Sequence, residues 1–233
     1  MPRGGMAEYR PWGDGQDGFP EADVSTTTTR RAAAPGWKGI AMPCTDDMEE
    51  GRVPQALLNH LLKSRTVLIN GVVDQDLTER VMSQLLVLDA ESHEPIRVFI
   101  TSQGGHVDSG LAIADVMHFV DSEITTIGAG WVASIAVPIL FGAPKKRRMA
   151  LPNTRFLLHQ PSGGAGGRAA DIRIEAQQIL RIRERLNELI AKETGQSVEK
   201  VTHDSDRNFW LTAPEAVEYG LISKVITRAS ELK

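Results

Sequence analysis

The sequence predicts an α/β protein in which a largely parallel sheet is covered by helices. Short β-branched and aliphatic runs alternate along the chain with longer segments of helical periodicity. In addition, a strand, a glycine-rich turn and a helix occur in that order at residues 96–120, and the same order starts again at residue 124. Such alternation implies right-handed crossovers, and it gathers catalytic groups at the carboxyl ends of the strands.

Residues 1–45 differ in composition from the rest of the chain. They hold clustered glycines and prolines, four successive threonines and no sustained apolar period, so they bury too little surface to order themselves. We expect a largely disordered extension or propeptide here, and one folded domain over residues 46–233. The three large aromatic residues of the extension fit either an incidental tail or a segment that docks on a neighbour or is cut off. They are Trp12, Phe19 and Trp37.

The folded part begins with a helix, a strand and a second helix. Pro54 suits a first helical turn, and leucines at helical spacing after it predict a helix over residues 54–62. Residues 66–71 form an aliphatic run that ends in Asn-Gly, which predicts a strand and a turn. Residues 74–91 carry apolar side chains every three or four positions and predict a longer helix.

The next elements hold the repeated unit. Residues 96–100 are rich in β-branched side chains and predict a strand, which leads into a glycine-rich turn at residues 102–110 and a helix at 111–120. Residues 124–127 predict another strand, and a short helix is expected to start at Ser134, after the glycines.

The last part of the chain contains one long helix. The basic run at residues 144–148 is predicted to be a solvated hairpin, since it lies between two apolar strands in a net acidic chain. A strand at 156–159 and a glycine-rich loop lead to a helix at 169–194, which Gly195 ends. Its single apolar stripe with charged flanks favours packing against another subunit. A capping box and an early proline start a helix at 212–220, and a strand at 221–226 ends the fold.

Composition excludes several classes of function. The formal net charge of −4 gives no long-range attraction to nucleic acid, and no segment approaches the roughly 20 apolar residues of a membrane span. Cys44 is the lone cysteine, and the histidines are scattered, so neither a disulfide nor a metal site is expected. The start lacks a secretory signal, and its acidic residues argue against a transit peptide. We expect a cytoplasmic protein that needs no cofactor.

Ser134 is the candidate nucleophile, because it is a small hydroxyl in an otherwise apolar run between glycines and a helix start. Acyl transfer by serine needs a base, a group that orients the base, and backbone N–H donors for the oxyanion. His159 and Asn208 are the candidates for base and orienter. On pattern alone, Ser134 is more often a small, hydrogen-bonded residue of a helix, and a histidine at a strand end such as His159 is more often a packed or capping group. The G-x-S-x-G elbow of α/β-hydrolases is absent.

Three segments resemble the ClpP family of self-compartmentalising serine peptidases. They are Ala-Ser-Ile-Ala at 133–136, Leu-His-Gln-Pro-Ser-Gly-Gly at 158–164, and Leu-Thr-Ala-Pro-Glu-Ala-Val-Glu-Tyr-Gly-Leu at 211–221. The resemblance spans about residues 46–230 and implies a fold of repeated β-β-α units with a long handle helix, the handle region covering about 160–195. It implies Ser134 as nucleophile and His159 as base. The Ser-Gln-Gly-Gly turn at 102–105 implies that the backbone N–H groups of Gly105 and Ile135 form the oxyanion hole.

Asn208 is the main departure from the family pattern, which has an aspartate at this position. The Asn208 amide oxygen can still accept a hydrogen bond from His159 but supplies no charge to stabilise an imidazolium. We therefore expect low activity, with about 10⁴-fold, roughly 5 kcal/mol, as the upper bound of the loss. Asp204 and Asp206 are alternative orienters that lie out of register. Gln103 replaces a proline of the glycine turn, a change expected to have a minor effect.

The resemblance also implies an assembly of two stacked heptameric rings, made of this chain alone or with a paralogue. Asp206 and Arg207 match a pair that links the rings. Phe99 and Phe119 match part of the apolar cleft that docks an AAA+ unfoldase of the ClpX, ClpA or ClpC type, although Arg97 replaces a frequent aromatic there. The expected function is that of an ATP-independent serine endopeptidase core subunit, and the expected substrates are unfolded polypeptides. One alternative is a structural or regulatory ring subunit. Another is the related crotonase fold, against which the combination of Ser134 and His159-Gln-Pro argues.

Overall fold

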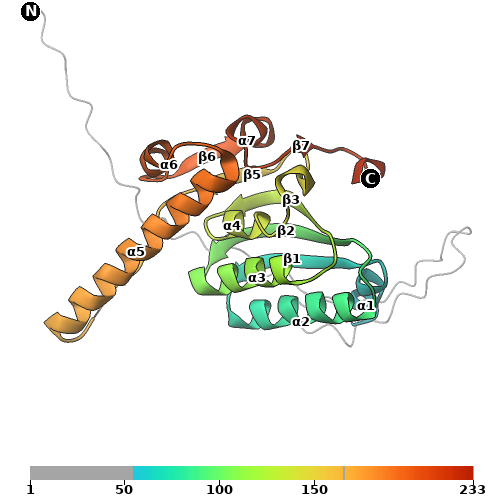
Figure 1. The fold of residues 1–233 in the computed structure, drawn as a ribbon, viewed down its shortest axis with the longest axis horizontal. Helices are drawn as coiled ribbons and strands as arrows, with labels where there is room; N and C mark the ends of the chain where they lie inside the picture. Colours follow the sequence, from blue (N-terminus) through green and yellow to red (C-terminus); the bar gives the residue numbers. More distant parts are fainter. Residues whose placement is uncertain (1–54, 165, 233) are drawn as a thin grey trace, which may run out of the picture. The chain divides into compact units, whose positions relative to one another are not determined.

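The computed structural model describes residues 55–164 and 166–232, so the extension predicted at residues 1–45 lies outside the described residues. Within these residues seven strands form one sheet, in the order β1-β2-β3-β4-β7, with β5 paired to β3 and β6 paired to β5 (Figure 1). The strands are β1 (Thr66–Val73), β2 (Ile96–Gly105), β3 (Ile124–Ala133), β4 (Arg148–Ala150), β5 (Arg155–Leu158), β6 (Phe209–Thr212) and β7 (Lys224–Val225).

Every strand pair of this sheet is parallel except β5 with β6. The predicted α/β class with a largely parallel sheet is therefore confirmed. The helices are α1 (Gln55–Lys63), α2 (Gln75–Glu91), α3 (Val107–Phe119), α4 (Ala136–Leu140), α5 (Ala169–Thr194), α6 (Val198–Asp204) and α7 (Ala213–Tyr219). Short 3-10 turns lie at Lys145–Arg147 and Ala229–Leu232. In the described part of the chain, no helix combines the length and the apolar character needed to cross a bilayer.

The core forms between the sheet and helices α2, α3 and α4. The four apolar positions that predicted α2, namely Leu77, Val81, Leu85 and Leu88, are all buried. Side chains of β1 and β2 alternate, so that Val67, Ile69, Val98 and Ile100 point into the same core. Helices α2 and α3 lie side by side along the sheet, and α5 runs away from it (Figure 1).

Strand β1 runs through the Asn70-Gly71 pair that was predicted to be a turn and ends at Val73, and two further strands are longer than their sequence pattern predicts. Strand β2 continues through the predicted glycine turn to Gly105, and β3 continues to Ala133. Pairing explains both extensions, since β1 contributes Val73 opposite Gly105, and Ser102 of β2 lies opposite Val132 of β3. Ladder hydrogen bonds with distant partners thus outweigh the turn propensity of glycine. Strand β7 has only two residues of the six predicted, and α6, β4 and β6 were not predicted.

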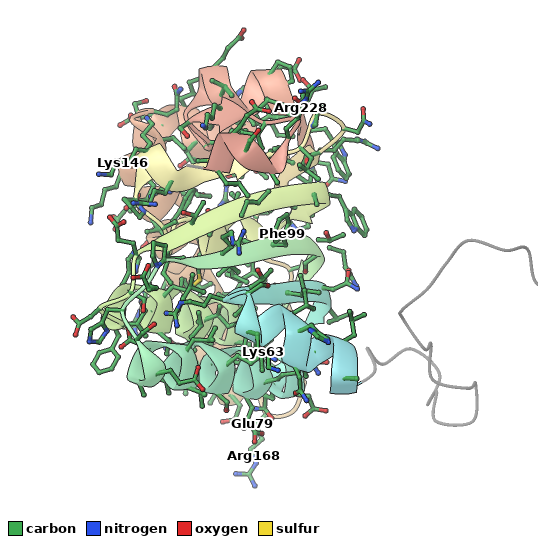
Figure 2. The ribbon with its side chains drawn as sticks, turned by 90° about the vertical axis from the view of Figure 1, so that its right-hand side faces the viewer. Lys63, Glu79, Phe99, Lys146, Arg168 and Arg228 are labelled. Atoms are coloured by element: carbon green, nitrogen blue, oxygen red, sulfur yellow. The ribbon has the colours of Figure 1, made fainter. Side chains whose placement is uncertain are left out.

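The basic run at residues 144–148 is not the solvated hairpin that was predicted. Lys146 is exposed (Figure 2), but Arg148 is 2% exposed and begins β4. Its guanidinium donates to the Ala143 carbonyl at 2.7 Å and pairs with the Glu193 carboxylate, while Lys145 Nζ donates to the Thr194 carbonyl at 3.1 Å. These contacts anchor the carboxyl end of α5, where positive charges also interact favourably with the negative end of the helix dipole. A charge run gives no hint of such a distant acidic partner, which is why the prediction failed.

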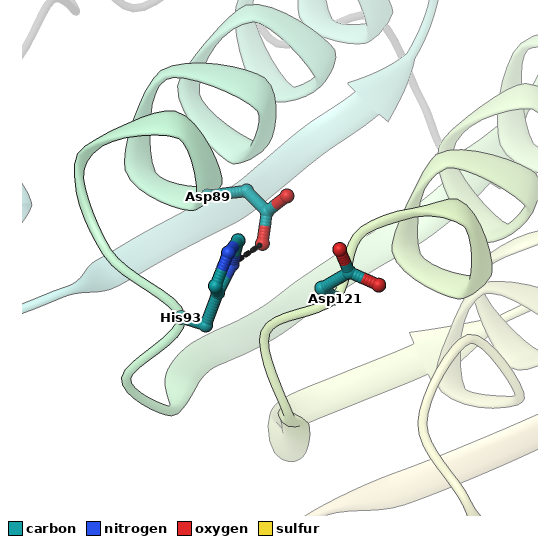
Figure 3. A group of neighbouring side chains, drawn as sticks. All are labelled: Asp89, His93 and Asp121. Carbon is teal, nitrogen blue, oxygen red and sulfur yellow. Dashed lines mark hydrogen bonds and ion pairs between the residues drawn. The ribbon is translucent and has the colours of Figure 1, made fainter.

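Asp89 holds the carboxyl end of α2 against the loop that leads into β3. Its Oδ1 accepts hydrogen bonds from Ser122 N at 2.8 Å and Ser122 Oγ at 2.7 Å, and it lies 3.2 Å from His93 Nδ1. Figure 3 shows this contact with His93, and Asp121 nearby. The Ser122 hydroxyl is the largest cause that lowers the pKa of Asp89 to about 2, an effect that partial burial opposes. The ionised carboxylate is therefore the form that the fold stabilises.

Asp89 should make the stability of the domain depend on acid pH. Because its folded-state pKa lies below the ordinary value of 3.8, its contribution is complete above about pH 4 and is lost as the pH falls toward about 2. Between those pH values, we expect the unfolding midpoint of the wild-type protein to fall more steeply than that of Asp89→Asn. Urea unfolding at a series of pH values measures this. Glu91→Gln, at the exposed end of the same helix, is the control. Equal slopes for wild type and Asp89→Asn would contradict the assignment.

Candidate active site

Ser134 does not begin a helix, as was predicted; it lies at a strained turn between β3 and α4, which starts at Ala136. Its φ of +57° is left-handed, and in the part of the chain that the structure describes only Arg65 shares this property among residues other than glycine. The Ser134 N–H donates to the Leu157 carbonyl of β5 at 2.9 Å, and the Ser134 carbonyl accepts from Val137 N at 3.0 Å. The left-handed backbone conformation is unfavourable for a residue with a Cβ, and these two hydrogen bonds stabilise it. Strained residues held in this way are typical of functional sites. The side chain is half-buried.

Gly104 lets the end of β2 pass directly beside this turn. A Cβ on Gly104 would lie 2.7 Å from Ser134 Cβ and 2.8 Å from the Ala133 carbonyl oxygen, and its φ of +94° also favours glycine. The Gly104 N–H is already used, because it donates to Ser102 Oγ at 3.0 Å. The approach of the two strand ends is thus possible only without a side chain at position 104.

The close approach of Gly104 also reaches Ile135, one of the two residues, with Gly105, whose backbone N–H groups are expected to form the oxyanion hole. Ile135 follows Ser134 directly, and its N–H has no acceptor among residues 55–164 and 166–232. The position that a Cβ of Gly104 would take is 3.3 Å from Ile135 N, whereas a Cβ on the next residue, Gly105, would meet the Val73 backbone of β1. Backbone N–H groups in a fixed geometry can stabilise a developing oxyanion without reorganisation.

His159 and Asn208 are brought together by strand register. His159 follows β5, and Asn208 precedes β6; since Leu158 pairs with Phe209 in the antiparallel ladder, the next positions outward oppose each other. The His159 Nδ1 atom lies 3.3 Å from Asn208 Oδ1. An amide oxygen accepts only, so this contact assigns the proton to Nδ1 and leaves Nε2 as the basic nitrogen.

Ser134 and His159 line one apolar pocket. No direct hydrogen bond links the Ser134 hydroxyl to the imidazole within the described residues, a common state of catalytic pairs without substrate. The side chains around them come from α3, the β3–α4 turn, α4, β5, the loop after β5, and α5. The lining residues are Val107, Ser134, Ile135, Pro138, Leu158, His159, Pro161, Leu186 and Ile190. Apart from the hydroxyl and the imidazole, all of these side chains are hydrocarbon.

The two alternative orienters are engaged elsewhere. Asp204 Oδ2 accepts from Lys200 Nζ at 2.6 Å and from Tyr219 OH at 3.0 Å. Burial pushes the pKa of Asp204 upward, but the hydrogen bonds from Lys200 and Tyr219 outweigh it, so the pKa is lowered overall. Asp206 Oδ1 lies 3.4 Å from the Arg183 guanidinium. Among the described residues, neither carboxylate contacts His159, which leaves Asn208 as its partner.

The residues predicted for assembly do not line the pocket of Ser134, but Asp206 and Arg207 line a neighbouring hollow together with His159 and Asn208. Asp206 is exposed, and the Arg207 side chain is 92% exposed and reaches Asp206 Oδ2 only at 4.0 Å. Phe119 ends α3 and is 78% exposed, whereas Phe99 is half-buried on β2 beside Ile127, Met149 and Ile226 (Figure 2).

Sequence reasoning missed that α5 helps to build the pocket. Leu186 and Ile190 belong to the apolar stripe that was predicted to meet another subunit, yet they line the cavity beside Ser134. Their spacing of four residues was visible, but nothing in it distinguishes a pocket wall from a subunit contact. Pro138 of α4 and Val107 of α3 were likewise not singled out.

Gly104→Ala should damage both folding and the reactivity of Ser134. The new Cβ meets Ser134 Cβ, whereas a Cβ on Gly71, at a φ of +84°, meets nothing within 4 Å. Gly71→Ala therefore measures the cost of the left-handed backbone alone, about 1–2 kcal/mol. We expect Gly104→Ala to lose more stability in urea unfolding, and to react more slowly with a phosphonylating serine probe followed by intact mass. Equal losses in the two variants would show that the close approach at Ser134 is unimportant.

The Clp protease family model matches residues 49–229. The chain is 46% identical over 188 residues to the ATP-dependent Clp protease proteolytic subunit 3 of Rhizobium etli, which covers 81% of this chain and 95% of the relative. It is 50% identical over 179 residues to the ATP-dependent Clp protease proteolytic subunit 2 of Gluconobacter oxydans, covering 76% and 80%.

A solved structure agrees with the sequence relatives. It is ClpP1 from Listeria monocytogenes in a mutant form that carries aspartate in place of an asparagine. It superposes with a TM-score of 0.71 at 46% identity and covers 76% of this chain and 99% of that one. Family match, close relatives and fold thus coincide over the residues that carry the pocket. The chain belongs to the Clp protease family, in which it is a proteolytic core subunit and a serine-type endopeptidase.

Proposed function

We propose that the chain hydrolyses peptide bonds through an acyl-enzyme on Ser134, with His159 as base and Asn208 as the residue that orients it. The observation that carries this proposal is the 3.3 Å contact between His159 Nδ1 and Asn208 Oδ1, since it leaves Nε2 free as the base while His159 and Ser134 line the same pocket. The Gly105 and Ile135 N–H groups are proposed to form the oxyanion hole.

The reaction proceeds in two halves. Ser134 Oγ attacks the carbonyl carbon of the substrate while His159 Nε2 takes the hydroxyl proton, and the backbone N–H groups stabilise the oxyanion. The tetrahedral intermediate collapses as His159 gives the proton to the leaving amine, which breaks the C–N bond and leaves an ester on Ser134. Water then attacks the ester with His159 again as base, and the acid product leaves.

Asn208 limits the rate of this reaction. Its amide oxygen holds the Nδ1–H tautomer, but it adds no negative charge beside the imidazolium that forms in each half-reaction. The contact is exposed, and its length of 3.3 Å exceeds that of a charge-assisted hydrogen bond. We therefore propose low intrinsic activity. The contact that Asn208 already makes keeps the loss below the about 10⁴-fold seen when an aspartate is replaced in the serine protease template.

The chain is a subunit of a Clp protease assembly, and we propose two stacked heptameric rings for it. Helix α5 supports the ring–ring contact: it leaves the sheet and exposes Ile172, Ile174 and Leu180. Asp206 and Arg207 are proposed to link the rings, and Phe99 and Phe119 to contribute to docking of an AAA+ unfoldase that feeds unfolded chains. The relatives from Rhizobium etli and Gluconobacter oxydans are named as proteolytic subunits of an ATP-dependent Clp protease, which supports an unfoldase partner. We propose a cytoplasmic location and a peptidase domain over residues 46–233, with residues 1–45 as an extension or propeptide.

A second candidate function is that of a structural or regulatory subunit that activates a paralogue. Two observations favour it: the neutral Asn208 beside His159, and relatives numbered as subunits 2 and 3, which indicates more than one proteolytic subunit per organism. In that case the pocket of this chain contributes little, and the assembly with the paralogue carries the activity.

Asn208→Asp and Ser134→Ala separate the two functions. With a fluorogenic peptide and the purified assembly, we expect Asn208→Asp to raise kcat by at least about tenfold, since it adds the missing charge, and Ser134→Ala to abolish hydrolysis. Native mass measurement of each variant checks that the assembly is unchanged. If Asn208→Asp gains nothing and Ser134→Ala loses nothing, this chain alone is not the catalyst, and mixing it with a paralogue tests the second function.

The apolar pocket should select an apolar side chain before the cleaved bond. Burying a charged side chain among hydrocarbon groups is costly, so we expect kcat/KM for leucine or methionine to exceed that for aspartate or lysine by about a hundredfold or more. Leu186→Trp, which fills the pocket, should lower kcat/KM for the leucine peptide. Leu86→Trp, at an exposed position of α2, is the control. Comparable rates for leucine and aspartate peptides would mean that this pocket does not hold the substrate side chain.

A further inference from the structure

A buried polar link joins helix α5 to the segment that carries Asn208. Asn187 of α5 is 5% exposed, and Ser205, which directly follows α6, is 1% exposed. Ser205 Oγ donates to Asn187 Oδ1 at 3.2 Å, and Asn187 Nδ2 donates to Thr202 Oγ1 at 3.1 Å. Because buried polar groups are costly without partners, this set favours one alignment of α5 with residues 202–205.

The main chain of Ser205 continues the link to His159. The Ser205 carbonyl accepts from Gln160 N at 2.8 Å, and the Gln160 side chain donates to the Asp206 carbonyl at 2.9 Å. Gln160 directly follows His159, and Ser205 lies three residues before Asn208. The residues that flank the His159–Asn208 contact are therefore clamped to each other by two hydrogen bonds, and Ser205 is fixed from behind by Asn187.

The same turn of α5 also shapes the pocket beside Ser134. Leu186, the neighbour of Asn187, and Ile190, one turn later, both line it. One face of the helix thus meets the substrate pocket while an adjacent side chain holds the segment that orients the base. A shift of α5 along its axis would move both at once.

We propose that Asn187 and Ser205 are positioning residues that set the geometry of His159 and Asn208. The proposal rests on the proposed catalytic function of that pair. A charged orienter attracts the imidazole N–H over a distance, whereas the neutral Asn208 amide does so only weakly, so its alignment must come from the surrounding scaffold. The position of α5, through Asn187 and Ser205, then decides how much of the time His159 is held in the productive tautomer and orientation.

The test compares kcat and KM for Ser205→Ala, Ser205→Thr and Thr194→Val in the purified full-length assembly. Ser205→Ala removes the hydroxyl, and we expect kcat to fall about ten- to a hundredfold while KM stays within about twofold, because the pocket residues are unchanged. Ser205→Thr keeps the hydroxyl and should restore kcat. Thr194 is a buried α5 residue whose hydroxyl donates to the Ile190 carbonyl, away from Gln160. Thr194→Val should therefore lower the melting temperature without lowering kcat.

The same substitution in the Asn208→Asp protein tests whether the effect of Ser205 depends on the neutral side chain of Asn208. In Asn208→Asp, where charge holds the imidazole, Ser205→Ala should cost less in kcat than it does in the wild-type protein. An equal cost in both backgrounds would indicate a merely structural role for Ser205 and would overturn the proposal.

Crystal structures of the wild-type and Ser205→Ala proteins supply a measurement that does not depend on activity. We expect the separation of His159 Nδ1 from Asn208 Oδ1 to exceed hydrogen-bond distance in the variant, or the two side chains to adopt several conformers. An unchanged contact overturns the positioning role, even if the wild-type assembly hydrolyses no peptide. If the wild-type assembly hydrolyses no peptide but the contact is disrupted in Ser205→Ala, the proposed catalysis is refuted and the positioning role stands.

Discussion

The pairing of β5 with both β3 and β6 is the constraint on which the active site depends. Strand β5 runs parallel to β3 with Leu157 beside Ala133, and antiparallel to β6 with Leu158 beside Phe209. The residues that follow or precede these pairs are Ser134, His159 and Asn208, so one central strand brings together groups from distant parts of the chain. Because side chains alternate along a strand, a slip of one residue would turn His159 to the other face.

The turn at Ser134 depends on close packing that only small groups permit. Gly104 passes against Ser134, and a Cβ on Gly110 of α3 would lie 2.3 Å from Ile135 Cγ1. These close contacts fix the backbone positions of Ser134 and Ile135. From the β5 side, the Leu157 carbonyl accepts a hydrogen bond from the Ser134 N–H. The strain of the turn is therefore held by the sheet and by α3, and these contacts fix the backbone of Ser134, the proposed nucleophile.

Periodicity predicted what is local in this fold. It located α2, α5 and the first strands, and the capping box of Thr212 and Glu215 is present. It could not predict the extension of β2 to Gly105, the burial of Arg148 or the contact of Asn187 with Ser205, because each depends on a partner far away in the sequence. For the site, pattern alone left Ser134 and His159 as ordinary residues. The resemblance of the motifs identified both as candidate catalytic residues, whereas the part of the pocket wall formed by α5 could be recognised only in the structure.

The most direct test of this account is the covalent reaction of the assembled protein with a fluorophosphonate, followed by intact mass and peptide mapping. If Ser134 is a nucleophile whose base is His159, one adduct per chain should form on Ser134. His159→Ala should abolish it, and Asn208→Asp should accelerate it. Failure of Ser134 to react in the intact assembly, or an adduct that forms equally fast in His159→Ala, would contradict the proposed roles of these two residues.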